Sequence, residues 1–220
     1  MTPGNIAGMA KLAGYDVIAL SDHNSAKNCP AFLAACRNNG IIGIPAMELS
    51  TREEVHVLCV FPDLESALRF DDYVYARLPD IPNKSGFFGE QLIINEADEI
   101  TGTEDKLLIT ASDIGIYEVR VLLKELGGIA IPAHVDRSSF SLLTNLGFYD
   151  RSLGFDILEF SKDADVEEII KANPDMTELG VMINSDAHSL TDMPDAKRVI
   201  EARDTEISSI LQGIKHLHVS

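Results

Sequence analysis

The sequence of 220 residues contains few cysteines, few basic side chains and no long apolar run. A membrane-spanning helix needs about 18 or more consecutive apolar residues, and none of the apolar runs is that long. The first four residues, Met-Thr-Pro-Gly, do not resemble a signal peptide. The sequence therefore predicts a cytoplasmic protein without a membrane partner.

The three cysteines, Cys29, Cys36 and Cys59, are odd in number and lack the spacing of a zinc finger. We expect reduced thiols, the first two on or near a helix and the third buried in a strand. This usage gives little support to thiol catalysis.

Basic residues are scarce, because 18 Lys and Arg face 35 Asp and Glu, a net charge of −17. So acidic a protein repels polyphosphate backbones, and no stripe of aromatic and basic residues suggests nucleic-acid binding. We therefore predict that duplex DNA is not a partner. A small phosphorylated substrate stays open, since part of the charge can belong to carboxylates that bind cations.

Apolar runs typical of strands alternate with helical patterns along the whole chain, without repeats or linkers. The expected strands are 15–20, 41–45, 54–61, 129–134, 155–160 and 181–184, and the expected helices are 6–13, 30–37, 64–78, 116–126, 166–171 and 207–214. This alternation predicts one α/β domain, 1–220, with a parallel sheet or barrel. Residues 79–112 break the pattern and predict a β-hairpin insertion with strands at 92–95 and 106–110.

Polar side chains with metal-binding chemistry follow the expected strands, where ligand sites of such folds lie. Each has a structural alternative: Asp22 and Asp186 can cap helices, Glu48 can pair with Arg52, and His56 can be packed in its strand. The joint pattern instead favours a metal site, because mixed imidazole and carboxylate ligands suit Zn²⁺, Mn²⁺ or Fe²⁺. The candidate ligands are His23, Glu48, His56, His134, Asp186 and His188.

Five motifs carry these residues in the order SDHN, PAMEL, EVHVL, IPAH and NSDAH. This series resembles the PHP (polymerase and histidinol phosphatase) family over about residues 1–194, outside the insertion. The resemblance implies a distorted TIM-like (β/α)7 barrel with up to three divalent metal ions. It implies that Glu48, His56 and His134 hold one ion, Glu48 and Asp186 a second, and His23 and His188 a third. Asp22 would orient this corner, so Asp22 and His23 are the candidate catalytic residues.

The sequence departs from the family in one respect, because PHP proteins open with a strand that carries His-x-His. We therefore expect a barrel that lacks its first strand. The sequence is then a shortened chain or has a misplaced start codon, or it is a genuine short form with degraded metal binding. A third hypothesis places the His-x-His of the tail, His216 and His218, in the vacant strand position.

The resulting functional hypothesis is metal-dependent hydrolysis of phosphoester bonds in a small phosphorylated or nucleotide substrate. Arg52 and Arg137 are weaker candidates to bind phosphate, and Lys27 is a more distant one. The alternatives are a non-catalytic metal-binding or regulatory module, an inactive shortened form, and an exonuclease on short nucleic-acid ends. An enzyme needs an open coordination position, whereas a structural site closes its shell. The insertion either shapes substrate choice or a subunit contact, or simply covers one end of the barrel.

Overall fold

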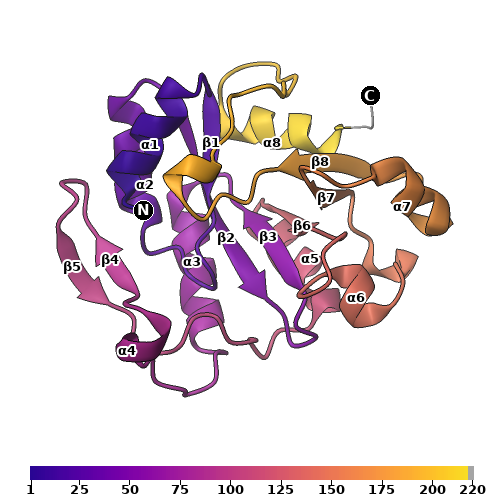
Figure 1. The fold of residues 1–220 in the computed structure, drawn as a ribbon, viewed down its shortest axis with the longest axis horizontal. Coiled ribbons are helices and arrows are strands. Elements are labelled where there is room, and N and C mark those ends of the chain that lie inside the picture. Colours follow the sequence, from indigo (N-terminus) through magenta and orange to yellow (C-terminus); the bar gives the residue numbers. More distant parts are fainter. Residues whose placement is uncertain (218–220) are drawn as a thin grey trace.

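The computed structural model describes residues 1–217 as a mixed α/β fold built around one four-stranded sheet (Figure 1). Its strand order is β1-β2-β3-β6, and two smaller sheets, β4-β5 and β7-β8, flank it. The strands are β1 (Val17–Leu20), β2 (Ile42–Ser50), β3 (His56–Val60), β4 (Leu92–Ile94), β5 (Ile100–Thr103), β6 (Ile129–Pro132), β7 (Ile157–Ser161) and β8 (Gly180–Asn184).

Strand β3 runs antiparallel to both of its neighbours, β2 and β6, whereas β1 and β2 are parallel. The expectation of a parallel arrangement throughout is wrong at this strand. Strand β3 is antiparallel to β2 because the connection 51–55 between them is short, and a parallel crossover needs about a dozen residues or more. The described residues form separate sheets, and a closed barrel is not seen in residues 1–217.

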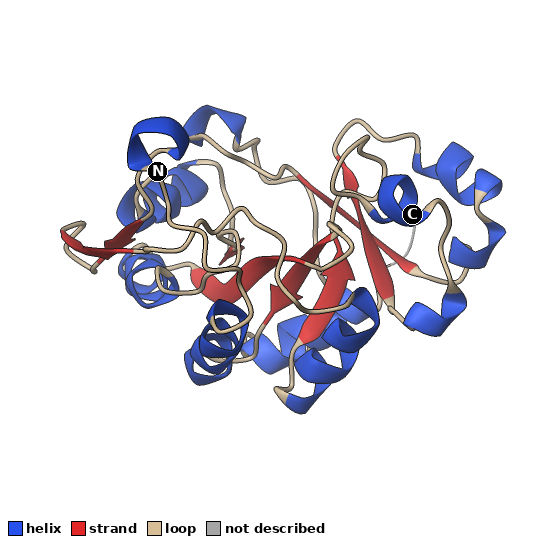
Figure 2. Ribbon diagram, turned by 90° about the horizontal axis from the view of Figure 1, so that it is seen from below, coloured by secondary structure: helices blue, strands red, loops and turns tan. Residues whose placement is uncertain are grey.

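Helices lie around the central sheet, which occupies the middle of the molecule (Figure 2), whereas the hairpin β4-β5 lies at its margin (Figure 1). They are α1 (Pro3–Leu12), α2 (Cys29–Asn38), α3 (Leu64–Tyr75), α4 (Ser85–Phe88), α5 (Ile116–Glu125), α6 (Leu142–Leu146), α7 (Val166–Ala172) and α8 (Ile207–Lys215). Local signals set several boundaries. The Thr2 hydroxyl accepts a hydrogen bond from the Asn5 amide before α1, and the Asp63 carboxylate accepts one from the Ser66 amide before α3.

Strands β3 and β6 of the central sheet are buried along their whole length and β2 is buried from Gly43 onward, whereas β1 is only partly buried. One face packs against α3 and α5 through side chains such as Phe61, Phe70 and Leu123, and the other packs against α8 through Leu58 and Ile210. Burying one such side chain stabilises the fold by about 1.5–3 kcal/mol. The buried polar side chains Glu48, Ser50 and His56 lie near the end of the sheet where β2 connects to β3.

The insertion forms a hairpin, as expected, but its second strand is β5 (Ile100–Thr103) and not 106–110. The Asn95 carboxamide oxygen accepts hydrogen bonds from the amides of Ala97 and Glu99, at 2.9 and 3.0 Å. This turn reverses the chain earlier than its apolar pattern indicates. The apolar residues Leu107 and Leu108 are instead buried outside any strand.

All three thiols are free and buried, with Cys29 and Cys36 in α2 and Cys59 in β3, which confirms their expected placement. Burial raises the pKa of Cys29 and of Cys36 to about 12, so both stay protonated. Within residues 1–217, none of the helices combines the length and the hydropathy that crossing a membrane requires.

Candidate metal centre

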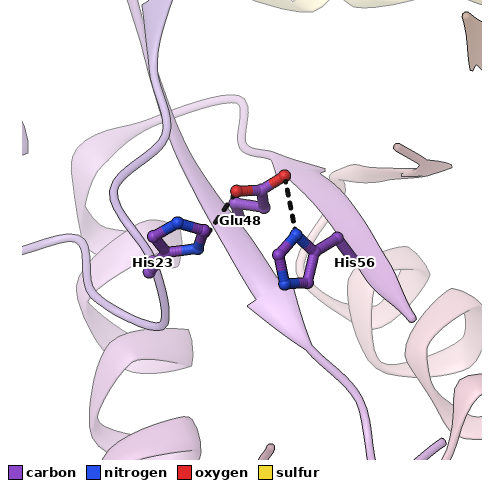
Figure 3. Close-up of side chains that lie close together, drawn as sticks. All are labelled: His23, Glu48 and His56. Atoms are coloured by element: carbon purple, nitrogen blue, oxygen red, sulfur yellow. Dashed lines mark ion pairs between the residues drawn. The ribbon is translucent and has the colours of Figure 1, made fainter. Parts of the chain in front are cut away.

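The carboxylate of Glu48 lies at the centre of a cluster of three imidazoles (Figure 3 shows two of them). Its Oε2 atom is 3.1 Å from His23 Nδ1. Its Oε1 atom is 3.3 Å from His56 Nδ1 and 3.3 Å from His134 Nε2. The two oxygens of one buried carboxylate thus face different histidines.

Strand pairing explains why these residues meet. The β1–β2 pairing continues past the end of β1 as an isolated bridge between His23 and Glu48, which lies inside β2 and not after the strand as expected. The start of β3 pairs with the end of β2, so His56 lies opposite Ser50. His134 follows β6, which is antiparallel to β3 and therefore ends at the same edge.

The imidazole nitrogens of this cluster have unused bonding capacity. The Nδ1 atoms of His23, His56 and His134 are buried, and none makes a hydrogen bond of acceptable geometry within residues 1–217. A buried polar atom without a partner is unfavourable, and native proteins contain few of them. Three imidazoles around one carboxylate are a donor set that Zn²⁺, Mn²⁺ and Fe²⁺ accept, so the residues fit a divalent metal ion.

Burial and the contacts within the cluster shift the pKa values of its members. Burial opposes ionisation of Glu48, but contacts with His134 and His56 outweigh it and hold the pKa of this carboxyl well below its usual range. Burial lowers the pKa of His23 and so favours the neutral imidazole that binds metal. For His134 burial acts in the same direction, yet the nearby Glu48 carboxylate raises its pKa overall.

Asp186 and His188 bring the end of β8 to the exposed side of the cluster. The His188 ring centroid is 6.4 Å from that of His23, and its Nδ1 is 3.8 Å from Asp186 Oδ1. Arg137 donates to Asp186 Oδ2 through Nη1, at 2.6 Å. The His188 side chain is 64% exposed and that of His23 is 32% exposed, whereas that of Glu48 is 10% exposed. The site is therefore buried on one side and open to solvent on the other.

Backbone strain concentrates around the cluster. Six non-glycine residues within 1–217 have a positive φ, and four of them belong to this region: Asn24, His134, Phe140 and Asp186. Such conformations are unfavourable by about 1–3 kcal/mol each and persist where the surrounding structure enforces them, often at functional sites.

The structure places the other predicted residues as follows. Asp22 Oδ2 accepts a hydrogen bond from Asn28 Nδ2 at 3.0 Å, and burial raises the pKa of Asp22. Arg52 Nε donates to Asp113 Oδ1 at 2.7 Å, and its guanidinium also approaches Glu118, so Arg52 is not brought to the cluster. Lys27 pairs with Glu104 of the insertion.

Two residues at the site were not predicted. Glu159 in β7 is 5% exposed, and burial raises its pKa to about 7, with a further contribution from Glu48. A single acid inside the apolar run 155–160 was the signal that could have identified it. Phe140 stacks on His56 at a ring-centroid distance of 4.8 Å, and its carbonyl accepts the His56 amide hydrogen bond. It lies in a loop without a sequence signal.

The tail lies beside the start of β8, because the Leu217 carbonyl accepts a hydrogen bond from the Val181 amide. Asp186 and His188 follow the other end of that strand. His216 is exposed at the end of α8, away from the Glu48 cluster, and His218 lies outside the described residues. The structure thus gives His216 no place in the site.

Comparisons with known proteins reveal relatives by structure alone. No family model matches the sequence, and no curated protein matches it. Endonuclease Q from Pyrococcus furiosus, a lesion-specific endonuclease, aligns with a TM-score of 0.66 and 22% identity over 98% of this chain and 51% of that chain. A protein from Bifidobacterium adolescentis assigned as a metal-dependent phosphoesterase aligns with a TM-score of 0.60 and 16% identity, covering 100% of this chain and 92% of that one.

A second endonuclease Q structure, in complex with a 27-mer duplex that carries an abasic lesion, aligns with a TM-score of 0.62 and 22% identity. This chain spans about half the length of the endonuclease Q chains, covering 51% and 52% of them. At these identities the comparisons establish the fold. They also show that the prediction made from the net charge, that duplex DNA is not a partner, is wrong, because a protein of this fold binds a DNA duplex.

Proposed function

We propose that this protein is a metal-dependent hydrolase of phosphoester bonds. The observation that carries the proposal is the buried Glu48 carboxylate, whose two oxygens face different imidazoles. The buried Nδ1 atoms of these imidazoles make no hydrogen bond of acceptable geometry within residues 1–217. A carboxylate in this position can bridge two divalent ions, the arrangement that enzymes use to clamp a phosphoryl group. The fold shared with an endonuclease and with a protein assigned as a phosphoesterase supports the same reaction class.

We propose three sets of ligands for the metal ions. Glu48, His56 and His134 would hold one ion on the buried side of the site. Glu48 and Asp186 would together hold a second ion, and His23 and His188 would hold a third. When bound, such ions stabilise charge on phosphoryl oxygens and make water a nucleophile at neutral pH.

The protein's own side chains have separate tasks. Asp22, fixed by Asn28, orients the corner that carries His23. Arg137 holds Asp186, and its guanidinium lies where it can also bind a phosphoryl oxygen. The exposed His188 leaves the substrate side open, which favours an enzyme over a non-catalytic module whose metal shell is closed.

Hydrolysis of a generic phosphomonoester in the presence of Mn²⁺ or Zn²⁺ tests the proposal. We expect metal-dependent turnover that falls at least about 100-fold in His134→Ala, since its Nε2 contacts the central carboxylate. His216→Ala is the matched control, because His216 is exposed at the end of α8, and this variant keeps the parent activity. Equal turnover in both variants, or none in the parent with any of the metals, would refute the proposal for monoesters.

A second candidate is cleavage of DNA at a lesion. The alignment of 98% of this chain with endonuclease Q bound to abasic duplex DNA favours it. An end-labelled duplex with one abasic site, compared with the undamaged duplex, tests this candidate. Internal cleavage only at the lesion supports it, progressive shortening from the ends supports an exonuclease, and an intact duplex excludes both.

A further inference from the structure

Asn28 connects the insertion to the candidate metal centre. Its Nδ2 atom donates to the Leu92 carbonyl at 3.1 Å, and its Oδ1 atom accepts from the Ile94 amide at 3.0 Å, so one carboxamide pairs with strand β4 at two points. The same Nδ2 atom donates to Asp22 Oδ2 at 3.0 Å. A single side chain therefore links the insertion to the residue that precedes His23.

Asn24 makes a similar connection on the other side of His23. Its Nδ2 atom donates to the carbonyls of Leu108 and Thr110, at 2.7 and 2.9 Å, in the last part of the insertion. Its Oδ1 atom accepts from the Ser50 amide at 2.9 Å, in the strand that carries Glu48. Asn24 is fully buried and has a φ of 47°, so these hydrogen bonds also hold a strained backbone.

An ion pair strengthens the attachment. Lys27 pairs with Glu104 at the end of β5, and its ammonium lies 4.7 Å from the centroid of the Tyr75 ring. The Glu104 side chain is 6% exposed, so the pair is shielded from solvent on the side of the insertion. The loop 21–28 is thus fixed to the insertion at three separate side chains.

The histidines differ in how much they depend on this attachment. His56 lies in β3 and His134 follows β6, so the central sheet positions both. His23 itself lies in the loop 21–28, outside any strand, and strand β2 holds this loop through hydrogen bonds of Glu48 and Ser50 on either side of His23. On α3, Asp71 accepts further hydrogen bonds from the loop. A metal ligand must be held within about 0.5 Å of its productive position, so a ligand in a loop depends on every element that fixes the loop, and the insertion is one of them.

We propose that the insertion, 79–112, is the positioning element of the His23 corner and that Asn28 is the residue through which it acts. The inference rests on the proposed function in one respect, because it requires that the protein binds metal ions. It does not require the proposed reaction. This role differs from substrate choice, a subunit contact or a cover for one end of the barrel, since it makes the affinity for one particular ion depend on a hairpin outside the sheet. We expect an ion held by Glu48, His56 and His134 not to share this dependence, because β3 and β6 position the two histidines.

Titration of the full chain with Co²⁺, followed by its visible absorption, tests the inference. The binding step lost in His23→Ala identifies the ion that His23 holds. We expect Asn28→Ala to weaken that step by about 10–100-fold and to leave the other steps unchanged, as is typical when a group that orients a ligand is removed. Asn83→Ala is the matched control, because Asn83 bonds to Gly89 within the insertion and its variant binds like the parent.

Asn28→Asp separates positioning from space filling. The aspartate has nearly the same size and can accept the Ile94 amide hydrogen bond, but it cannot donate to Asp22 or to the Leu92 carbonyl. We expect it to weaken the same step at least as much as Asn28→Ala, and it serves as the folded variant if the alanine change disrupts the chain.

Three results would overturn the inference: an Asn28→Asp protein that binds like the parent, an equal loss at every step, or a parent without a step sensitive to His23→Ala. The readout is a spectrum and a stoichiometry, so it is independent of phosphoester cleavage. An active enzyme with normal cobalt binding in Asn28→Asp would refute only this inference, whereas the expected cobalt losses without turnover would refute only the proposed reaction.

Discussion

The buried carboxyl of Glu159 predicts an unusual dependence of stability on pH. Glu159 is 5% exposed in β7, and burial raises its pKa from 4.5 to about 7. We expect Glu159→Gln to stabilise the metal-free protein at pH 8, because glutamine has the shape of the protonated acid and never has to be ionised in the interior.

The sign and the size of the expected stability difference follow from the pKa shift of Glu159. The folded protein holds the Glu159 proton more tightly than the unfolded chain, so the contribution of Glu159 to stability is greatest below pH 4.5 and is lost as the pH rises through 7. A shift of one pKa unit corresponds to about 1.4 kcal/mol. The shift of Glu159 therefore gives about 3 kcal/mol in favour of the variant at pH 8, and about 1 kcal/mol at pH 5.

Urea unfolding in EDTA, followed by circular dichroism at several pH values between 5 and 8, measures this difference. Glu178→Gln is the matched control, because Glu178 is exposed and the same change there should leave the free energy of unfolding unaltered. A difference between the parent and Glu159→Gln that stays constant over this range would refute the reasoning. So would a variant that is less stable than the parent at pH 8.

Three further predictions concern other parts of the structure. Phe140→Ala removes the ring stacked on His56 and should weaken Mn²⁺ binding about 10-fold in isothermal titration calorimetry, whereas Phe148→Ala, at a 62% exposed side chain, should not. Ile131→Ala, at a fully buried position in β6, should lower the free energy of unfolding by about 2–5 kcal/mol in urea. The three buried thiols should react with Ellman's reagent only after unfolding, and rapid reaction of the native protein would contradict their burial.

The sequence predicts which polar residues lie close together better than it predicts the strand directions. Apolar runs ending in Asp-His, Pro-Ala-His and Ser-Asp-Ala-His placed ligands after strands, and the structure brings His23, Glu48, His56 and His134 together. The apolar pattern does not predict the direction of β3, because side chains alternate in the same way in parallel and antiparallel strands. The short connection 51–55 carried that information.

Tertiary contacts that no local pattern encodes account for what was missed. Glu159 belongs to the site because β7 places it near His134, and its sequence neighbours indicate only a buried strand. Asn24 and Asn28 look like loop residues, yet they bind carbonyls more than 60 residues away, with sequence separations of 84 and 64 to Leu108 and Leu92. Their role depends on an insertion whose docking the sequence does not predict.

The net charge of −17 was a poor guide to partners, because a phosphodiester at the site responds to nearby groups rather than to the sum. Charges are screened over about 8–10 Å at physiological ionic strength, so distant surface acids contribute little there. On the open side of the cluster Arg137 pairs with Asp186, and the Glu48 carboxylate faces the imidazoles, so neither acid is left without a partner. Divalent ions bound to these ligands would add positive charge to the same place, so an acidic protein can still offer a phosphodiester a favourable local field.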